Sequence, residues 1–340
     1  MKFQPWLTVT GIVASTMLIN TPQSLASIKT PDGEVTVKNH YAYSGGWELT
    51  DKIDQYEQNT SCYDLETTRP VHYRMWINRG IALQHQQRYR ESISCLDRAL
   101  SLQSKSESAW YRRGIALSHL RQYSQAAASY QQAIKIDPQK YSSWYNLANA
   151  YKHLDRHQEA IASYRQTITL KPDFHNAYYQ LGKMLEIAGE YEPAIAAYED
   201  AVDLEPEYHP AWYSQANLLQ KLQRYDEAIA IYQKTLELKP EQSQAWYNLG
   251  NIYFQKKDYY KAIAAYETAI ELKPDYDLAW NNHGVALEAL QQTSEALQSY
   301  SQALQVNPDY DRALINRRRL LMSVGGGSST LSNGNILNSK

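Results

Sequence analysis

Two sets of residues recur at a fixed spacing and are of types that bind metal ions. His85, His119 and His153 are each 34 residues apart. Acidic residues recur at the same spacing, at Asp173, Glu207, Glu241, Asp275 and Asp309. A metal ion needs ligands that converge within about 2.0–2.2 Å of one point, whereas packed helices lie about 8–10 Å apart. We therefore interpret the histidines as structural and the acids as favourable charge at helix N-termini, and we predict no metal ligands. A weak carboxylate-rich divalent site near the start of the array is left open.

No pattern typical of catalysis is present in the sequence. It contains no Gly-rich phosphate loop, no nucleophile elbow and no Cys/His zinc spacing. We therefore predict no catalytic or cofactor-binding residues and no cofactor, and we expect the protein not to be an enzyme.

A third recurrent set is suited to binding peptides. It consists of tyrosines and asparagines that lie close together in successive segments: Tyr111, Tyr145, Tyr179, Tyr213 and Tyr247, with Asn146, Asn149, Asn217, Asn248 and Asn251. Tyrosine rings offer flat apolar contact and amides both donate to and accept from a peptide main chain. Whether these residues form one surface depends on the elements that carry them.

Composition favours an elongated repeat array over a mixed globular core. The 340 residues include 29 Tyr and 8 Trp but only 3 Phe, and the mean hydropathy is −0.61. The formal net charge is −2. Nucleic acid requires a strongly basic face, so we expect no nucleic-acid partner.

The repeat is defined by three residue types that keep one period. Trp110, Trp144, Tyr178, Trp212, Trp246 and Trp280 are 34 residues apart, and so are six prolines from Pro138 to Pro308 and six tyrosines from Tyr130 to Tyr300. Trp76 and Gly80 extend the register upstream. The array therefore consists of seven repeats, at 73–106, 107–140, 141–174, 175–208, 209–242, 243–276 and 277–310.

Each repeat is predicted to form two helices. In the sixth, Trp246, Leu249, Gly250 and Tyr253 recur at helical spacing. Lys256-Lys257-Asp258 interrupts this pattern, and Ala262, Tyr266 and Ala269 then lie on a second helical face before Pro274 ends it.

These motifs resemble the tetratricopeptide repeat (TPR) family. The sixth repeat reads W246…L249-G250…Y253…A262…Y266…A269…P274, and the resemblance covers 73–310. It implies an all-α fold, a right-handed superhelical solenoid of TPR helical hairpins. Arg79, Arg113, Gln215 and His283 depart from the usual Leu, and Thr167 and Thr235 from a small Ala.

The resemblance also implies that the first helices line a concave groove that contains the recurrent tyrosines and asparagines. The alternative is that the tyrosines pack between neighbouring helices and that the asparagines cap or are solvated. Lysines of the family's carboxylate clamp would stand where Tyr111 to Tyr247 stand, so we expect no C-terminal carboxylate ligand. The amides resemble the repeat region of protein glycosyltransferases, whose large catalytic domain has no counterpart here.

The ends of the chain differ from the repeats. Lys2, the uncharged apolar run Leu7 to Ile19 and the small residues Ser24 and Ala26 are typical of a signal peptide at 1–26. The run is shorter than the roughly 20 residues that span a bilayer, so we expect no transmembrane segment in the mature chain. We assign 27–72 to an irregular N-terminal cap, 311–322 to a C-terminal capping helix and 323–340 to a flexible tail.

We therefore expect an exported bacterial protein, located in the periplasm or secreted. Its predicted function is to bind a peptide or partner protein in the groove as a non-enzymatic scaffold or assembly factor. The alternatives are a metal-handling periplasmic assembly factor, or a TPR subunit that works with a glycosyltransferase.

The two cysteines, Cys62 and Cys95, are predicted to form a disulfide that covers the first repeat, which has no hairpin upstream. Closing a loop of about 33 residues is worth about 3–4.7 kcal/mol, less any strain. Non-reducing peptide mapping of the naturally exported protein should recover the two cysteines in one linked peptide. Two free thiols in that material would contradict both the bridge and this account of the N-terminal cap.

Overall fold

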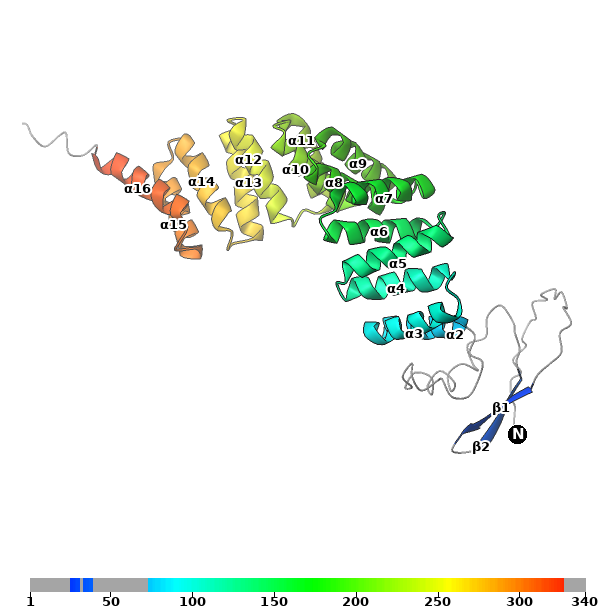
Figure 1. The fold of residues 1–340 in the computed structure, drawn as a ribbon. Helices are drawn as coiled ribbons and strands as arrows, with labels where there is room; N and C mark the ends of the chain where they lie inside the picture. Colours follow the sequence, from blue (N-terminus) through cyan, green and yellow to red (C-terminus); the bar gives the residue numbers. More distant parts are fainter. Residues whose placement is uncertain (1–24, 31–32, 39–72, 327–340) are drawn as a thin grey trace, which may run out of the picture. The chain divides into compact units, whose positions relative to one another are not determined.

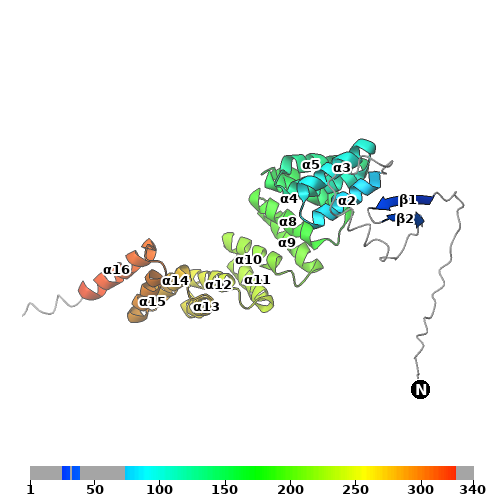
Figure 2. The same ribbon diagram turned by 90° about the horizontal axis from the view of Figure 1, so that it is seen from below.

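The computed structural model describes Leu25–Thr30, Gly33–Lys38 and residues 73–326. The chain divides into two compact units, Met1–Thr60 and Ser61–Lys340. In the first, β1 (Leu25–Thr30) and β2 (Gly33–Lys38) lie side by side as an antiparallel pair (Figure 2). β2 contains Val35, Thr36 and Val37, so this part of the segment that we assigned to an irregular cap is a strand. The expected cleavage point after Ala26 falls inside β1, and the start of the mature chain stays a prediction.

The second unit is built from helices that follow one another in chain order (Figure 1). The first helices of the hairpins are α2 (Tyr73–His85), α4 (Glu107–His119), α6 (Tyr141–His153), α8 (His175–Ile187), α10 (His209–Lys221), α12 (Ser243–Gln255) and α14 (Asp277–Ala289). The second helices are α3 (Tyr89–Leu102), α5 (Tyr123–Ile136), α7 (His157–Leu170), α9 (Tyr191–Leu204), α11 (Tyr225–Leu238), α13 (Tyr259–Leu272) and α15 (Thr293–Val306). A single further helix, α16 (Asp311–Gly326), follows the last hairpin.

Packing in this unit is between neighbours. The two helices of each hairpin pack on each other, and each second helix packs on the first helix of the next hairpin. The all-α repeat fold predicted from the sequence is therefore confirmed for residues 73–326.

A column of buried tyrosines holds each hairpin together. The six members, on the second helices of all repeats after the first, are Tyr130, Tyr164, Tyr198, Tyr232, Tyr266 and Tyr300, and each is at most 1% exposed. Glycine on the facing first helix makes room for the ring. A Cβ atom added to Gly250 would lie 2.7 Å from Cε1 of Tyr266. Ala148 and Ala216 stand at this position opposite Tyr164 and Tyr232, so the position requires a small residue.

The turn within each hairpin uses one left-handed residue. It is Gly189 in the fourth repeat (φ +80°) and a non-glycine elsewhere in the solenoid, for example Gln223 (φ 60°). The next residue closes the turn, because the N–H of Arg224 donates to the carbonyl of Leu219 at 2.9 Å. This is the Schellman pattern that ends many helices.

The recurrent tryptophans anchor loops, and most are only half-buried. Nε1 of Trp246 donates to the carbonyl of Pro240 at 2.9 Å, and Trp110, Trp144, Trp212 and Trp280 make the equivalent bond at 2.9–3.0 Å. Trp76, at 2% exposure, is the buried exception. The tyrosine column, more than the tryptophans, therefore fills the hairpin interior.

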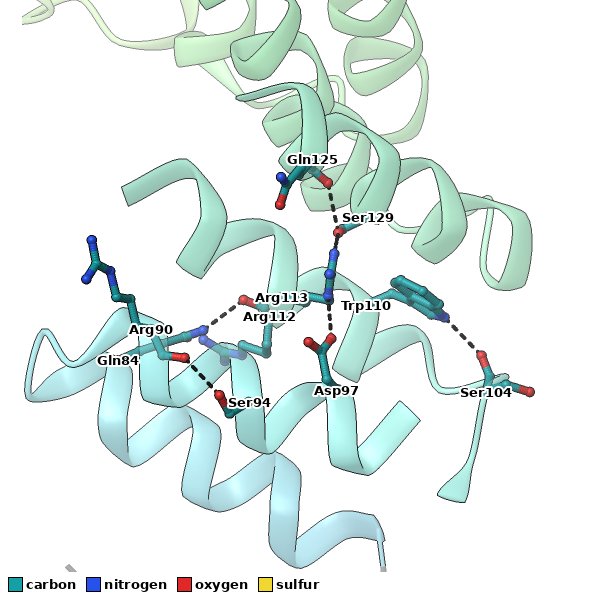
Figure 3. A network of polar contacts seen from close by, with 10 residues as sticks. All are labelled: Gln84, Arg90, Ser94, Asp97, Ser104, Trp110, Arg112, Arg113, Gln125 and Ser129. Carbon is teal, nitrogen blue, oxygen red and sulfur yellow. Dashed lines mark hydrogen bonds and ion pairs between the residues drawn. The ribbon is translucent and has the colours of Figure 1, made fainter. Parts of the chain in front are cut away.

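Three departures from the usual Leu are explained by polar partners in neighbouring helices. Nε of Arg113 donates to Asp97 of the preceding repeat at 2.6 Å, and its Nη1 donates to Ser129 at 2.8 Å (Figure 3). Gln215 donates in the same way to Glu199 at 3.0 Å. His283 lies 3.6 Å from Glu267. Where this position is Leu147, Leu181 or Leu249, the preceding repeat has Gln131, Arg165 or Gln233 in place of the acid.

The capping helix α16 closes the array on one side only. Ala313 and Leu320 are buried against the seventh repeat, and Arg319 pairs with Glu288 at 2.6 Å. Arg317 and Arg318 are exposed.

Candidate functional site

The first helices line two open cavities. The larger, of about 790 Å³, spans the fifth to seventh repeats and is lined by Asn217, Gln220, Lys221, Gln223, Tyr225, Asn251, Phe254, Gln255, Tyr266, Asn282 and Val285. The smaller, of about 280 Å³, lies at the second and third repeats and is lined by Ile115, Ser118, His119, Tyr123, Tyr130, Asn146, Asn149, Ala150 and His153. Four of the ten predicted groove residues, all of them asparagines, therefore line these cavities: Asn146, Asn149, Asn217 and Asn251.

The five predicted groove tyrosines are half-buried, and their rings pack on other aromatic rings. Each lies 5.8–6.2 Å from the buried tyrosine of its own repeat. Three also contact the last residue of their own repeat, which caps the next first helix: Tyr145 lies 4.9 Å from Phe174, Tyr179 lies 5.3 Å from Tyr208, and Tyr247 lies 5.0 Å from Tyr276. Burial raises the pKa of Tyr145 and of Tyr213. The alternative interpretation, in which these tyrosines pack between neighbouring helices, therefore describes much of their role.

Asparagines connect three of these tyrosines to the next repeat. Nδ2 of Asn146 donates to the hydroxyl of Tyr111 at 3.2 Å, and Asn248 donates to Tyr213 at 3.3 Å. Asn282, one repeat further on, donates to Tyr247 at 3.1 Å. Because each bond joins consecutive first helices, these amides fix the register of neighbouring hairpins. Asn78, at the same place in the first repeat, is exposed.

The second group of asparagines accepts hydrogen bonds from the buried tyrosine column. Asn149 accepts from the hydroxyl of Tyr164 at 2.6 Å, and Asn251 accepts from Tyr266 at 2.8 Å. Asn217 accepts from Tyr232, which also donates to Gln220 at 2.8 Å. A buried phenol needs such an acceptor because an unsatisfied buried hydroxyl costs about 1–3 kcal/mol.

The two asparagine groups meet at the larger cavity. Asn248 donates to Oδ1 of Asn217, and Asn282 donates to Oδ1 of Asn251, both at 2.9 Å. The oxygens of Asn217 and Asn251 are thus each used twice. Among the described residues, no hydrogen bond from Nδ2 of Asn251 is found. The Asn217 amide reaches the hydroxyl of Tyr213, where it opposes the burial that raises the pKa of that tyrosine. Since an amide nitrogen has two hydrogens, each asparagine keeps at least one donor for a ligand.

Sequence reasoning missed Gln220, Lys221 and Gln255 as lining residues of the larger cavity. The sequence did contain a signal for part of this polar lining. Each repeat with the buried tyrosine carries a polar partner on its first helix, either an asparagine such as Asn149 or, one turn later, a residue such as Ser118, Glu186 or Glu288. The first repeat has Leu96 in place of the tyrosine and Ile81 in place of the asparagine.

The histidines stack on tyrosines of the preceding repeat. The ring of His119 lies 4.4 Å from Tyr89, and that of His153 lies 4.3 Å from Tyr123, both nearly parallel. Lys221 takes the equivalent place over Tyr191, with Nζ 4.6 Å from the ring centre. Burial, with the charges of Lys152 and Arg121, lowers the pKa of His153. These contacts agree with a structural interpretation of the ladder.

Two features of the wider chain bear on the remaining sequence predictions. Within the described residues there is no group of three or more His, Cys, Asp or Glu side chains placed to hold a metal ion, and no helix long and apolar enough to cross a membrane. Cys95 is fully buried and disulfide-bonded. Its predicted partner, Cys62, lies outside the described residues, as do 1–24, the rest of the N-terminal cap from 39 to 72 and the tail from 327, so the pairing stays a prediction.

Comparison with known families identifies the class of protein. Models described as tetratricopeptide repeats match residues 72–139, 111–173, 145–209, 213–277 and 278–310. The chain therefore belongs to the tetratricopeptide repeat family, as its motifs indicated. No curated protein matches the chain.

Several solved structures share the fold. YrrB, described as a TPR protein with an unusual peptide-binding site, is 22% identical with a TM-score of 0.51, over 56% of this chain and 99% of its own. The C-terminal part of a TPR protein from Cytophaga hutchinsonii is 17% identical with a TM-score of 0.64, over 70% and 98%. A TPR protein from Parabacteroides merdae is 15% identical with a TM-score of 0.51, over 73% and 98%. At these identities the likeness concerns the fold alone.

The asparagine links predict a stability difference between two like positions. Asn248→Ala removes both bonds that join the fifth and sixth repeats through this side chain, to Tyr213 and to Asn217. We expect a loss of about 1–3 kcal/mol in the free energy of unfolding, measured by urea denaturation. Asn78→Ala, at the same position but exposed, should change it by less than about 0.5 kcal/mol. Equal losses of unfolding free energy in the two variants would show that the hydrogen bonds of Asn248 do not stabilise the fold.

Proposed function

We propose that this protein is a non-enzymatic scaffold or assembly factor, which binds an extended segment of a partner protein along its first helices. The observation that carries the proposal is the larger cavity, where Asn217 and Asn251 are held in place through their oxygens and keep amide donors for a ligand. Amide donors fixed at the spacing of the repeats suit the carbonyl groups of an extended main chain.

Half-buried tyrosines beside these amides support the same function. A rigid aromatic ring that is already packed loses little conformational freedom when a ligand contacts it. The description of YrrB as a TPR protein with an unusual peptide-binding site is consistent with such a role.

We further propose that the protein acts outside the cytoplasm. The signal-like pattern of residues 1–26 supports export. The disulfide at Cys95 supports it independently, since disulfides persist mainly in oxidising compartments.

The test replaces donors without removing the internal bonds. In Asn217→Asp/Asn251→Asp, the carboxylate oxygens can still accept from Tyr232, Tyr266 and the neighbouring amides, but no N–H remains for a ligand. Tyrosine variants are less suitable because their rings are part of the packing. The double variant and the wild type are used as bait in extracytoplasmic extract of the source cells, and retained proteins are identified by mass spectrometry.

Gln125→Glu/Gln139→Glu is the matched control, since both residues are exposed on or beside the second helices and the change in charge is the same. We expect the wild type and the control to retain a common partner, and the Asn217→Asp/Asn251→Asp variant to lose most of it. Retention of the same proteins by all three would contradict the proposed site.

A further inference from the structure

Three lysines of the first helices lack counter-ions in the described part of the solenoid. Lys152 on α6, Lys183 on α8 and Lys221 on α10 form no ion pair within the described residues. Lysines elsewhere are of both kinds: Lys140 pairs with Glu107 at 3.0 Å and Lys256 with Asp226 at 2.5 Å, whereas Lys135 and Lys239, at the ends of second helices, form no ion pair within the described residues. The unpaired lysines of the first helices lie in three consecutive repeats.

Lys152 and Lys183 act on each other. Nζ of Lys152 donates to Oε1 of Gln180 on α8 at 3.0 Å, which holds it across the junction between the third and fourth repeats. Lys183 lies on the same helix as Gln180, with Nζ 5.8 Å from the ring centre of Tyr179. Burial and the charge of Lys183 lower the pKa of Lys152. A half-buried ammonium group whose charge is disfavoured by burial and by a second ammonium group is a position that an anion would stabilise.

The acids of this region are occupied or lie on other helices. Glu186, one turn after Lys183, accepts a hydrogen bond from the hydroxyl of Tyr198 at 2.9 Å. The second helix of the same hairpin and its flanks carry seven acids and no lysine or arginine: Glu190, Glu192, Glu199, Asp200, Asp203, Glu205 and Glu207. Within this hairpin the positive charge is therefore on the first helix and the negative charge on the second.

The larger cavity is likewise lined by positive charge and hydrogen-bond donors. Its lining includes Lys221 and amide donors of Asn217 and Asn251 but no acidic residue. A ligand that crosses the third to seventh repeats would meet two repelling ammonium groups, a third ammonium group and then amide N–H groups.

We infer that the partner segment is acidic, with Asp or Glu carboxylates placed at Lys152 and Lys183 and main-chain carbonyls at Asn217 and Asn251. This rests on the proposed peptide-binding function and adds the chemistry of the ligand. The chain as a whole carries a formal charge of −2, so attraction of an acidic segment would come from the local charge of the first helices and would weaken with salt.

The test uses two fluorescein-labelled peptides that differ only in charge. One alternates Glu and Ala and the other alternates Gln and Ala, each about twelve residues long, which spans about 40 Å when extended. Fluorescence anisotropy with the full chain should show that the Glu peptide binds at least about tenfold more tightly than the Gln peptide at low salt, and that the difference shrinks at high salt.

Lys152→Gln/Lys183→Gln should weaken binding of the Glu peptide about tenfold and leave binding of the Gln peptide unchanged. Lys135→Gln/Lys239→Gln removes the same charge from exposed residues at the ends of second helices and should change the affinity less than about twofold. Thermal melts establish that both variants are folded.

Equal affinities for the two peptides, equal effects of the two variants, or no binding of the Glu peptide would each overturn the acidic assignment. So would displacement of the Glu peptide by an oligothymidylate of equal charge at lower concentration. If both peptides bind equally and Asn217→Asp/Asn251→Asp abolishes that binding, the peptide-binding function stands without the acidic preference.

Discussion

The hydroxyl of the buried tyrosine is the constraint on which the rest of the solenoid depends. Six of the seven hairpins place a phenol in their interior, and burial raises the pKa of each, as in Tyr232 and Tyr266, well above the usual range of a tyrosine. A group that stays protonated and has no access to water must donate to an acceptor on the facing helix. That acceptor is a first-helix side chain in every case, and this requirement brings asparagines to the surface where a ligand could bind.

The same asparagines then link consecutive repeats. Asn217 and Asn251 accept from the tyrosine behind them and from the asparagine of the next repeat, so two bonds fix each amide plane. A side chain held in this way presents its remaining N–H group at a defined angle. Stability and binding are therefore properties of one network, in which the oxygen serves the fold and the nitrogen serves the ligand. Preorganised donors of this kind favour affinity because little side-chain freedom remains to be lost.

The period of the sequence was sufficient to predict the fold, because three residue types at 34-residue spacing specify which residues face the neighbouring helix. It also grouped the tyrosines and asparagines that lie along the first helices. The period could not predict which side-chain atoms bond to each other. The bond from Asn146 to Tyr111, for example, joins residues 35 positions apart and depends on how two hairpins stack. The loop contacts of the half-buried tryptophans could not be predicted for the same reason, since the carbonyl that accepts from each one comes from the preceding repeat.

The ion pairs of the protein could also be predicted only in part from the sequence. Arg113 stood out in the sequence as a departure from the family pattern, but its partner Asp97 is recognisable only once the two are placed across α3 and α4 (Figure 3). In contrast, the unpaired state of Lys152 and Lys183 depends on every acid around them, which a linear sequence does not place. The pairing of charged side chains between repeats is therefore the surface property that a repeat sequence predicts least well.

Side-chain amide NMR of the full chain, titrated with the Glu-Ala peptide, tests the central claim most directly. The account predicts that the ¹⁵N–¹H signals of the Asn217 and Asn251 amides shift with the peptide, while those of Asn248 and Asn282, whose hydrogens are already bonded within the protein, shift little. Shifts that leave Asn217 and Asn251 unchanged at saturating peptide would contradict it.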